Sequence, residues 1–69
     1  MVSEVEIGQR VKSVRKMSKV SILSLAKKAK VDPSQIHRME NGQHMPTLPT
    51  LDRISEALNT PLCYLVYGK

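Results

Sequence analysis

The chain has 69 residues and one cysteine, and it contains neither Phe nor Trp, so we expect one small domain, residues 1–69, with an aliphatic core and no internal disulfide. The cysteine and the two histidines are not spaced like zinc ligands, and no apolar run approaches the roughly 18 residues of a membrane span. The formal net charge is +5, and a stretch of eight basic residues without an acid favours nucleic acid over an anionic membrane surface. These residues are Arg10, Lys12, Arg15, Lys16, Lys19, Lys27, Lys28 and Lys30.

The first part of the chain contains two stretches of helical spacing. Apolar residues spaced by four and three predict a helix over residues 5–16. Ser21 is an N-cap candidate for a second, shorter helix over residues 22–29. The inward residues expected are Ile7, Val11 and Val14 in the first helix and Leu25, Ala26 and Ala29 in the second.

A third helix is predicted over residues 33–41. Asp32 is its expected N-cap, and the proline that follows loses nothing at the first helical position, where an N–H would have no partner within the helix. Gln35 stands three residues after Asp32, a spacing that allows a capping box. Gly42 suits the left-handed residue that ends a helix. The inward side expected here carries Ile36, Met39 and Glu40.

Two more helices are predicted in the last third of the chain. Thr47 caps a helix that starts near Leu48 and accommodates Pro49 in its first turn, and a final short helix begins near Pro61. The inward residues expected are Leu51, Ile54 and Leu58, followed by Leu62, Leu65 and Val66. Five short helices joined by connections of a few residues predict a compact all-α domain.

The second and third predicted helices are joined by a turn of about three residues, which is typical of a helix-turn-helix, here residues 21–41. In such a unit the second helix lies in the major groove of DNA. Helical geometry places one set of side chains opposite the inward face. This set is Pro33, Ser34, His37 and Arg38. Arg38 suits a guanine, Ser34 and His37 suit base edges or phosphate, and Pro33 offers only apolar contact. The alternative is that this set is simply an exposed helix surface.

Three longer segments carry a family resemblance: IGQRVKSVRK, SILSLAKKAKVDPSQIHRMENG and PTLPTLDRISEALNTPL. The most specific element is the ending IHRMENG of residues 36–42, which is similar to an I-x-x-[IL]-E-x-G pattern. From Ile7 to Leu65 the sequence therefore resembles the phage-repressor-like helix-turn-helix family, the Cro/C1 type (XRE-like transcriptional regulators). The resemblance implies a five-helix repressor-like fold and sequence-specific binding of double-stranded DNA.

The resemblance also implies roles for individual residues. The start of the second helix and the loop after the third approach the DNA backbone, and lysines of the basic stretch add to them. The residues expected to contact phosphates are Lys19, Ser21, Ile22, Lys27, Gln35, Asn41, Gln43 and His44. An ion pair between Arg15 and Glu40 is implied as well, and it would supply the partner that an inward-facing Glu40 needs.

Three positions depart from the family pattern. The family often has Gln where this chain has Ile22, and it usually has Gly in the turn where this chain has Lys30. A left-handed conformation is costly for lysine, so we expect a slightly different turn. Pro33 replaces a residue that often bonds a base. These departures weaken any transfer of a particular DNA sequence to this chain, but they leave the architecture intact.

A homodimer is expected from size and mechanism, because one reading helix covers only a few base pairs and two-fold repressors double the contact. The predicted symmetric interface consists of Pro49, Pro61, Leu62, Cys63, Tyr64 and Tyr67. The alternative is that these residues only close the core of the monomer. The corresponding DNA site would be palindromic or nearly so.

The sequence thus predicts a cytoplasmic transcriptional regulator, a repressor, without a cofactor or metal. Catalysis is not expected, because the histidines have no acid or nucleophile arranged beside them. A restriction–modification controller would be a similarly short dimer. The main alternative is an antitoxin-like or adaptor protein that binds a partner protein, since antitoxins use the same fold and fold alone does not fix function.

Overall fold

The computed structural model describes residues 3–69, which form five helices and no strand. These are α1 (Glu4–Met17), α2 (Ile22–Ala29), α3 (Pro33–Glu40), α4 (Leu48–Ala57) and α5 (Leu62–Tyr67). The predicted all-α class with five helices is confirmed, and the predicted bounds differ by a residue or two at the helix ends. Within residues 3–69, no helix has both the length and the apolar character needed to cross a bilayer.

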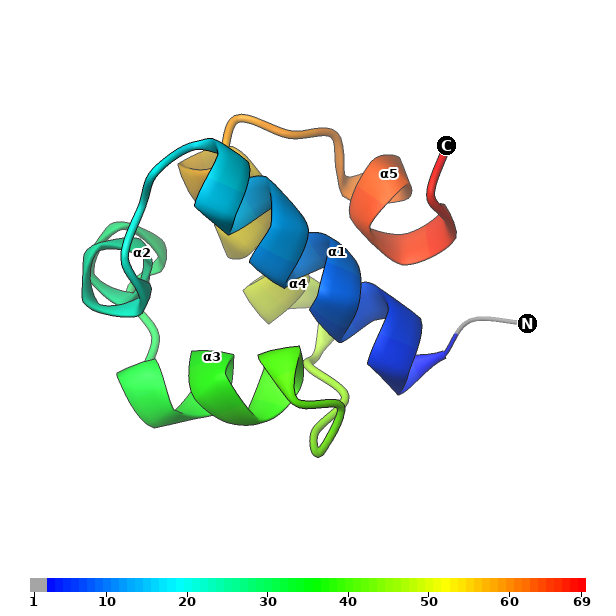
Figure 1. Ribbon diagram of the computed structural model, residues 1–69, viewed down its shortest axis with the longest axis horizontal. Helices are drawn as coiled ribbons and strands as arrows, with labels where there is room; N and C mark the ends of the chain where they lie inside the picture. The colour runs from blue at the N-terminus through cyan, green and yellow to red at the C-terminus, as the bar shows by residue number, and fades with distance from the viewer. Residues whose placement is uncertain (1–2) are drawn as a thin grey trace.

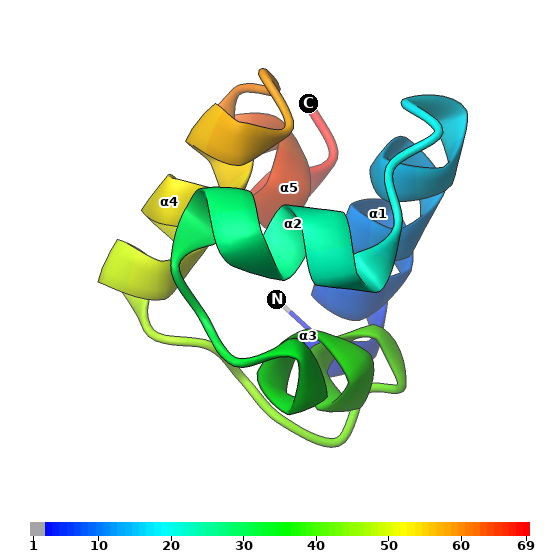
Figure 2. The same cartoon turned by 90° about the vertical axis from the view of Figure 1, so that its left-hand side faces the viewer.

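The helices enclose one core. Helix α1 packs against α3 and α5, α2 packs against α3 and α4, and α4 packs against α5. Figure 1 shows α3 along the lower edge, α2 at one side and α5 at the other, and Figure 2 shows α2 crossing above α3. The buried apolar residues are Ile7, Val11, Leu25, Ala26, Ala29, Ile36, Met39, Leu51, Ile54, Leu58 and Leu65. The predicted inward residues Val14, Leu62 and Val66 are only partly buried and pack on the rim of this core.

Three of the helices begin at the predicted caps. Ser21 Oγ accepts the Ser24 N–H at 3.0 Å, and Thr47 Oγ1 accepts the Thr50 N–H at 3.4 Å. Asp32 caps α3 differently from the prediction, because its carboxylate accepts the N–H of Ser34 at 2.9 Å. The N–H of Gln35 bonds the backbone carbonyl of Asp32 instead. The capping box predicted with Gln35 is therefore wrong, since the carboxylate is turned toward Ser34.

Helices α1 to α4 end in the same way. Each is followed by a residue with positive φ, namely Lys19, Lys30, Gly42 and Asn59. After α3, the N–H groups of residues 42 and 43 bond the carbonyls of residues 39 and 38, and the other three ends repeat this pattern. Gly42 takes the predicted left-handed conformation. The altered turn expected at Lys30 is wrong, because Lys30 keeps the left-handed geometry with φ 57° and ψ 47°. The two backbone bonds that close the turn offset the cost to lysine.

Candidate nucleic-acid interface

Helix α3 carries two faces of opposite character. Ile36 and Met39 are fully buried against α1 and α2, whereas the four predicted base-reading residues are all exposed. These four are Pro33, Ser34, His37 and Arg38. Figures 1 and 2 show that no other helix covers the outer side of α3. The structure therefore brings the predicted set together on one free, protruding surface.

A contact between the backbones of α1 and α3 sets how close α3 lies to α1, and the sequence analysis did not identify it. A Cβ atom added to Gly8 would lie 2.0 Å from the backbone oxygen of Met39, so the backbones of α1 and α3 touch at this point. Glycine costs roughly 0.5–1 kcal/mol in the middle of a helix relative to alanine. The available signal was Gly8 itself, placed inside a helical pattern next to the buried Ile7.

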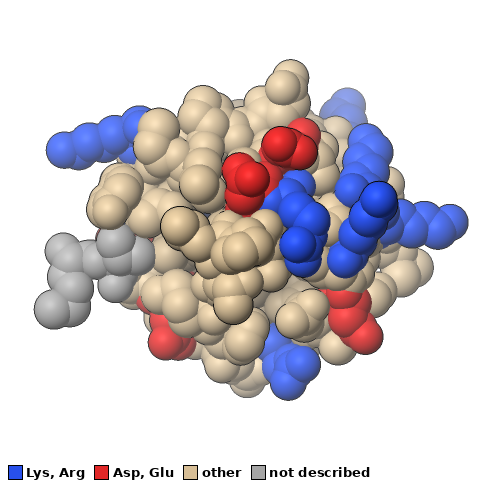
Figure 3. Space-filling model, turned by 180° about the vertical axis from the view of Figure 1, so that it is seen from behind, with Lys and Arg blue, Asp and Glu red and all other residues tan. Residues whose placement is uncertain are grey.

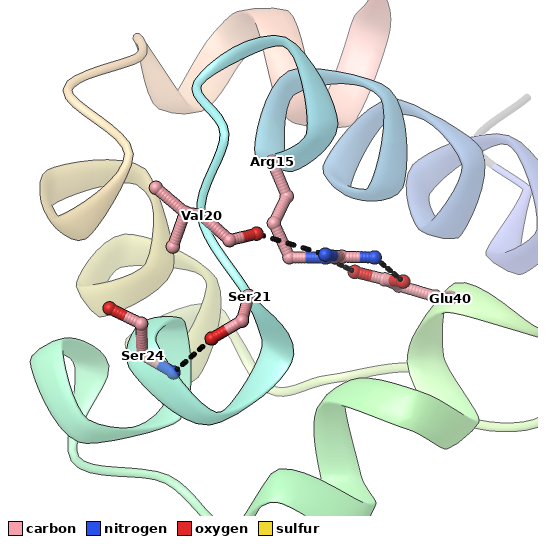
Figure 4. Close-up of polar contacts among 5 residues, drawn as sticks. All are labelled: Arg15, Val20, Ser21, Ser24 and Glu40. Carbon is pink, nitrogen blue, oxygen red and sulfur yellow. Dashed lines mark hydrogen bonds and ion pairs between the residues drawn. The ribbon is translucent and has the colours of Figure 1, made fainter.

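The predicted pair of Arg15 and Glu40 meets beneath α3 (Figure 4). Arg15 Nε donates to Glu40 Oε2 at 2.7 Å and Nη2 donates to Oε1 at 3.0 Å, while Nη1 donates to the carbonyl of Val20 at 2.9 Å. Both side chains are buried. The hydrogen bonds to Glu40 raise the pKa of Arg15 above its usual value, outweighing the effect of burial. This cluster ties the end of α1, the following turn and the end of α3 into one unit.

Two other arginines also bond backbone carbonyls at helix ends. Arg10 Nη1 donates to the carbonyls of Leu65 and Val66 in α5, at 3.1 and 3.0 Å. Arg53 Nε donates to the carbonyl of Ala29 at the end of α2, at 3.0 Å. Arg10 and Arg15 are thus engaged inside the protein, so the basic stretch offers fewer free cations than its sequence suggests.

Several basic side chains gather beside α2 (Figure 3). Figure 3, which views the molecule from behind, shows Lys and Arg side chains grouped on the side that α2 occupies. Lys28, Lys30 and Arg53 line a pocket there together with Glu56. This group lies where the C-terminal part of α2 meets α4.

Six of the eight predicted phosphate-contacting residues are exposed. Exposed members are Lys19, Ser21, Lys27, Asn41, Gln43 and His44, whereas Ile22 and Gln35 are half-buried. Ile22 packs on the core, so only its backbone is suited to a polar ligand. Ser21 Oγ accepts the Ser24 N–H and keeps its own proton to donate. The amide of Asn41 lies 3.4 Å from Nδ1 of His37, which places these two groups side by side.

The residues predicted for a dimer interface lie on α4 and α5, away from α3. Leu62 is half-buried and the others are exposed, Tyr67 to 65%. Leu48 was not predicted to belong to this set, yet it is 65% exposed and lines an apolar pocket with Pro49 and Leu62. The signal for Leu48 was its place next to Pro49 in the first turn of the helix.

The profile of the helix-turn-helix family HTH_3 matches residues 11–65. The immunity repressor protein of Bacillus phage phi105 is 33% identical over 60 residues, which are 87% of this chain but only 42% of that protein. The restriction-modification controller protein C.AhdI from Aeromonas hydrophila is similar in structure with a TM-score of 0.87 and 27% identity, over 90% of this chain and 94% of that one. The P22 c2 repressor, solved in complex with a synthetic operator, has a TM-score of 0.86 and 28% identity, over 91% and 96%. With this fold, this free face on α3 and these matches, the chain belongs to the helix-turn-helix family of phage-repressor type.

Proposed function

We propose that this chain is a transcriptional repressor that binds duplex DNA by inserting α3 into the major groove. The observation that carries the proposal is the face of α3, which is polar, exposed and held from behind by Gly8 and by the pair of Arg15 and Glu40. A rigid support matters because base readout depends on side chains held in fixed positions. The likeness to a repressor solved on its operator supports the same reading.

Within this proposal, each side chain on the outer face of α3 makes a different contact with the bases. Arg38 donates two parallel hydrogen bonds to O6 and N7 of a guanine. Pro33, which has no donor, contacts a thymine methyl group. His37 and Ser34 lie between them along the helix and bond base edges.

The flanking residues bind the DNA backbone. Lys19 and Lys27 supply charge, and Ser21 supplies a hydroxyl proton at the start of α2. The free N–H groups of that helix end point to a phosphate, a role that does not need the side chain of Ile22. Exposed polar residues of the loop after α3 complete the set, and they are Asn41, Gln43 and His44.

A homodimer places two α3 helices on a palindromic or nearly palindromic site in the cytoplasm. The proposed interface is the predicted set on α4 and α5, extended by Leu48, because Leu48 and Tyr67 are each 65% exposed there. Measuring the mass in solution over a range of concentrations tests it, and Tyr67→Ser should raise the dissociation constant of the dimer. A strict monomer on DNA would contradict the dimer.

The experiment that tests the function is selection of bound duplexes from a random pool. The protein should enrich one half-site, and Arg38→Ala should lose about 1–3 kcal/mol of binding free energy on that site together with the preference at one base pair. Lys27→Ala is the matched control, which should weaken specific and random duplexes equally and make the affinity less dependent on salt. A pool that emerges without any enriched sequence would contradict the proposal and favour a protein partner.

A further inference from the structure

The first turn of α3 contains a hydrogen bond that fixes what Ser34 is able to donate. Ser34 Oγ lies 2.7 Å from Asp32 Oδ1, and the backbone N–H of Ser34 donates to the same oxygen at 2.9 Å. These bonds hold the pKa of Asp32 below its usual range, the one from the hydroxyl having the larger effect. Because the carboxylate has no proton to give, the hydroxyl must be the donor. The single proton of Ser34 is therefore committed to Asp32, and its oxygen retains only lone pairs.

We infer that Asp32 makes Ser34 an acceptor-only reader of bases, which selects the exocyclic amino group of adenine or cytosine in the major groove. The inference rests on the DNA-binding function proposed above. Asp32 acts here as a positioning residue, since it works through the hydroxyl of Ser34.

The physical argument is one of hydrogen-bond polarity. A free serine hydroxyl bonds either donors or acceptors, so it discriminates poorly among bases. A bond from a hydroxyl to a carboxylate is roughly twice as strong as a neutral one. To donate to a guanine or a thymine, Ser34 would have to give up that bond. Adenine N6 and cytosine N4 carry hydrogens and need no such exchange.

The same face then holds two readers of opposite polarity. Ser34 accepts and Arg38 only donates, and the two residues stand one helical turn apart on exposed positions. Four residues of a helix rise about 6 Å, which is less than two base-pair steps of about 3.4 Å each. We therefore expect the selected amino group and the guanine read by Arg38 to lie in neighbouring base pairs, or in base pairs separated by one other pair.

The test begins with duplex selection for the wild-type protein and for Ser34→Ala. The base pair whose preference disappears in Ser34→Ala is the pair that Ser34 reads. Two altered duplexes are then made at this pair. One lacks the exocyclic amino group, with purine in place of adenine or pyrimidin-2-one in place of cytosine. The other lacks the N7 acceptor, with the 7-deaza form of the purine.

Loss of the amino group should weaken wild-type binding about tenfold more than it weakens Ser34→Ala. Comparing the two proteins on the same duplex cancels the effect of the altered base pairing. Loss of N7 should weaken both proteins equally. The inference is overturned if the wild type is specifically sensitive to N7, or if no base pair depends on Ser34.

Asp32→Gly tests the positioning role, because glycine is tolerated at a helix N-cap and leaves the Ser34 hydroxyl free. Freed of Asp32, the hydroxyl can donate as well as accept, so this variant should bind a duplex with an acceptor at that place, guanine O6 or thymine O4, about as well as the selected one. A preference for the amino group as strong as in the wild type would overturn the role of Asp32. The duplex comparison above stands without this variant if it folds poorly. A wild-type protein that enriches no sequence refutes the proposed function, whereas an enriched site with the wrong polarity refutes only this inference.

Discussion

The support beneath α3 and the packing of α5 are built on different principles. Under α3, backbone touches backbone at Gly8, and Glu40 is held by two hydrogen bonds from a buried arginine. Helix α5 buries one side chain fully, Leu65. Leu62 and Val66 pack only on the rim of the core, and Arg10 bonds the carbonyls of residues 65 and 66. Its Tyr67 remains 65% exposed. One end of the molecule thus has a fixed geometry, and the other has uncovered apolar surface.

This difference matches two different demands. Reading a base edge requires hydrogen-bond partners within a few tenths of an ångström, so the helix that reads must not shift. Association with a second copy depends mainly on apolar area, which tolerates some adjustment. Substitutions on the α3 side should therefore cost more stability than those on the α5 side, and they should also change DNA binding.

The largest effect is expected for Glu40→Ala. It leaves the guanidinium of Arg15 buried without its carboxylate, which typically lowers the free energy of unfolding by about 3–5 kcal/mol. Urea denaturation measures the loss. Glu56→Ala is the control, because Glu56 is exposed on α4 and its removal should change the free energy by less than about 0.5 kcal/mol.

The double variant Arg15→Met with Glu40→Leu shows how much of the loss in Glu40→Ala comes from the unpaired buried charge of Arg15 and how much from lost packing. Replacing a buried pair by apolar residues of similar size is often neutral, so the double variant should recover much of the stability lost in Glu40→Ala. Equal losses in Glu40→Ala and Glu56→Ala would mean that the ion pair does not hold α3.

The second effect is expected for Gly8→Ala. The added methyl group meets the backbone oxygen of Met39, so α3 must move outward, at a cost of about 1–3 kcal/mol. Specific DNA affinity should fall further than stability alone explains, because the reading face is displaced. Ser13→Ala, on an exposed position of the same helix, should leave both properties nearly unchanged. Wild-type affinity in Gly8→Ala would show that α3 does not need this contact.

The sequence predicted local features well and long-range ones poorly. Helix positions, the caps Ser21 and Thr47 and the left-handed Gly42 depend on residues close in the chain, and their patterns were readable. The pair of Arg15 and Glu40 joins residues 25 positions apart, so it came only from the family resemblance. Spacing alone gives no sign that such side chains meet.

The features that were missed depend on how helices cross. Gly8 matters because α1 and α3 approach at that point, which no periodicity reveals. Arg10 and Arg53 are long side chains that reach carbonyls of distant helices, so the sequence placed Arg10 with the free cations. At Lys30 the sequence indicated the cost of a left-handed lysine but not the 3.0 Å bond from Val31 to Ala26 that closes the turn.

On the α5 side, Arg10→Ala should lower the free energy of unfolding by about 1–2 kcal/mol. Hydrogen bonds to charged groups contribute about 1.5–3 kcal/mol, and the bonds of Arg10 are only partly buried. The loss should appear as faster hydrogen exchange in α5 and weaker self-association. The half-site selected from a random pool should stay the same, because α3 does not depend on this contact. Lys16→Ala, an exposed change on α1, is the matched control. A changed half-site in Arg10→Ala would show that the geometry of α3 depends on the packing of α5, so the two sides of the molecule would not be independent.

The smallest effect is a gain, expected for Lys30→Gly in the turn that leads into α3. Left-handed geometry costs a non-glycine residue about 1–2 kcal/mol, and glycine loses part of this advantage through its more flexible unfolded chain. The free energy of unfolding should therefore rise by about 1 kcal/mol, measured by urea denaturation. Lys28→Gly removes the same charge inside α2 and should lose about 1 kcal/mol instead. If Lys30→Gly raises the free energy of unfolding and Lys28→Gly lowers it, the turn before α3 is strained in the wild type. The buried contacts behind α3 are then strong enough to maintain that strain. Equal losses would mean that lysine fits the turn without cost and that the turn itself helps to fix α3.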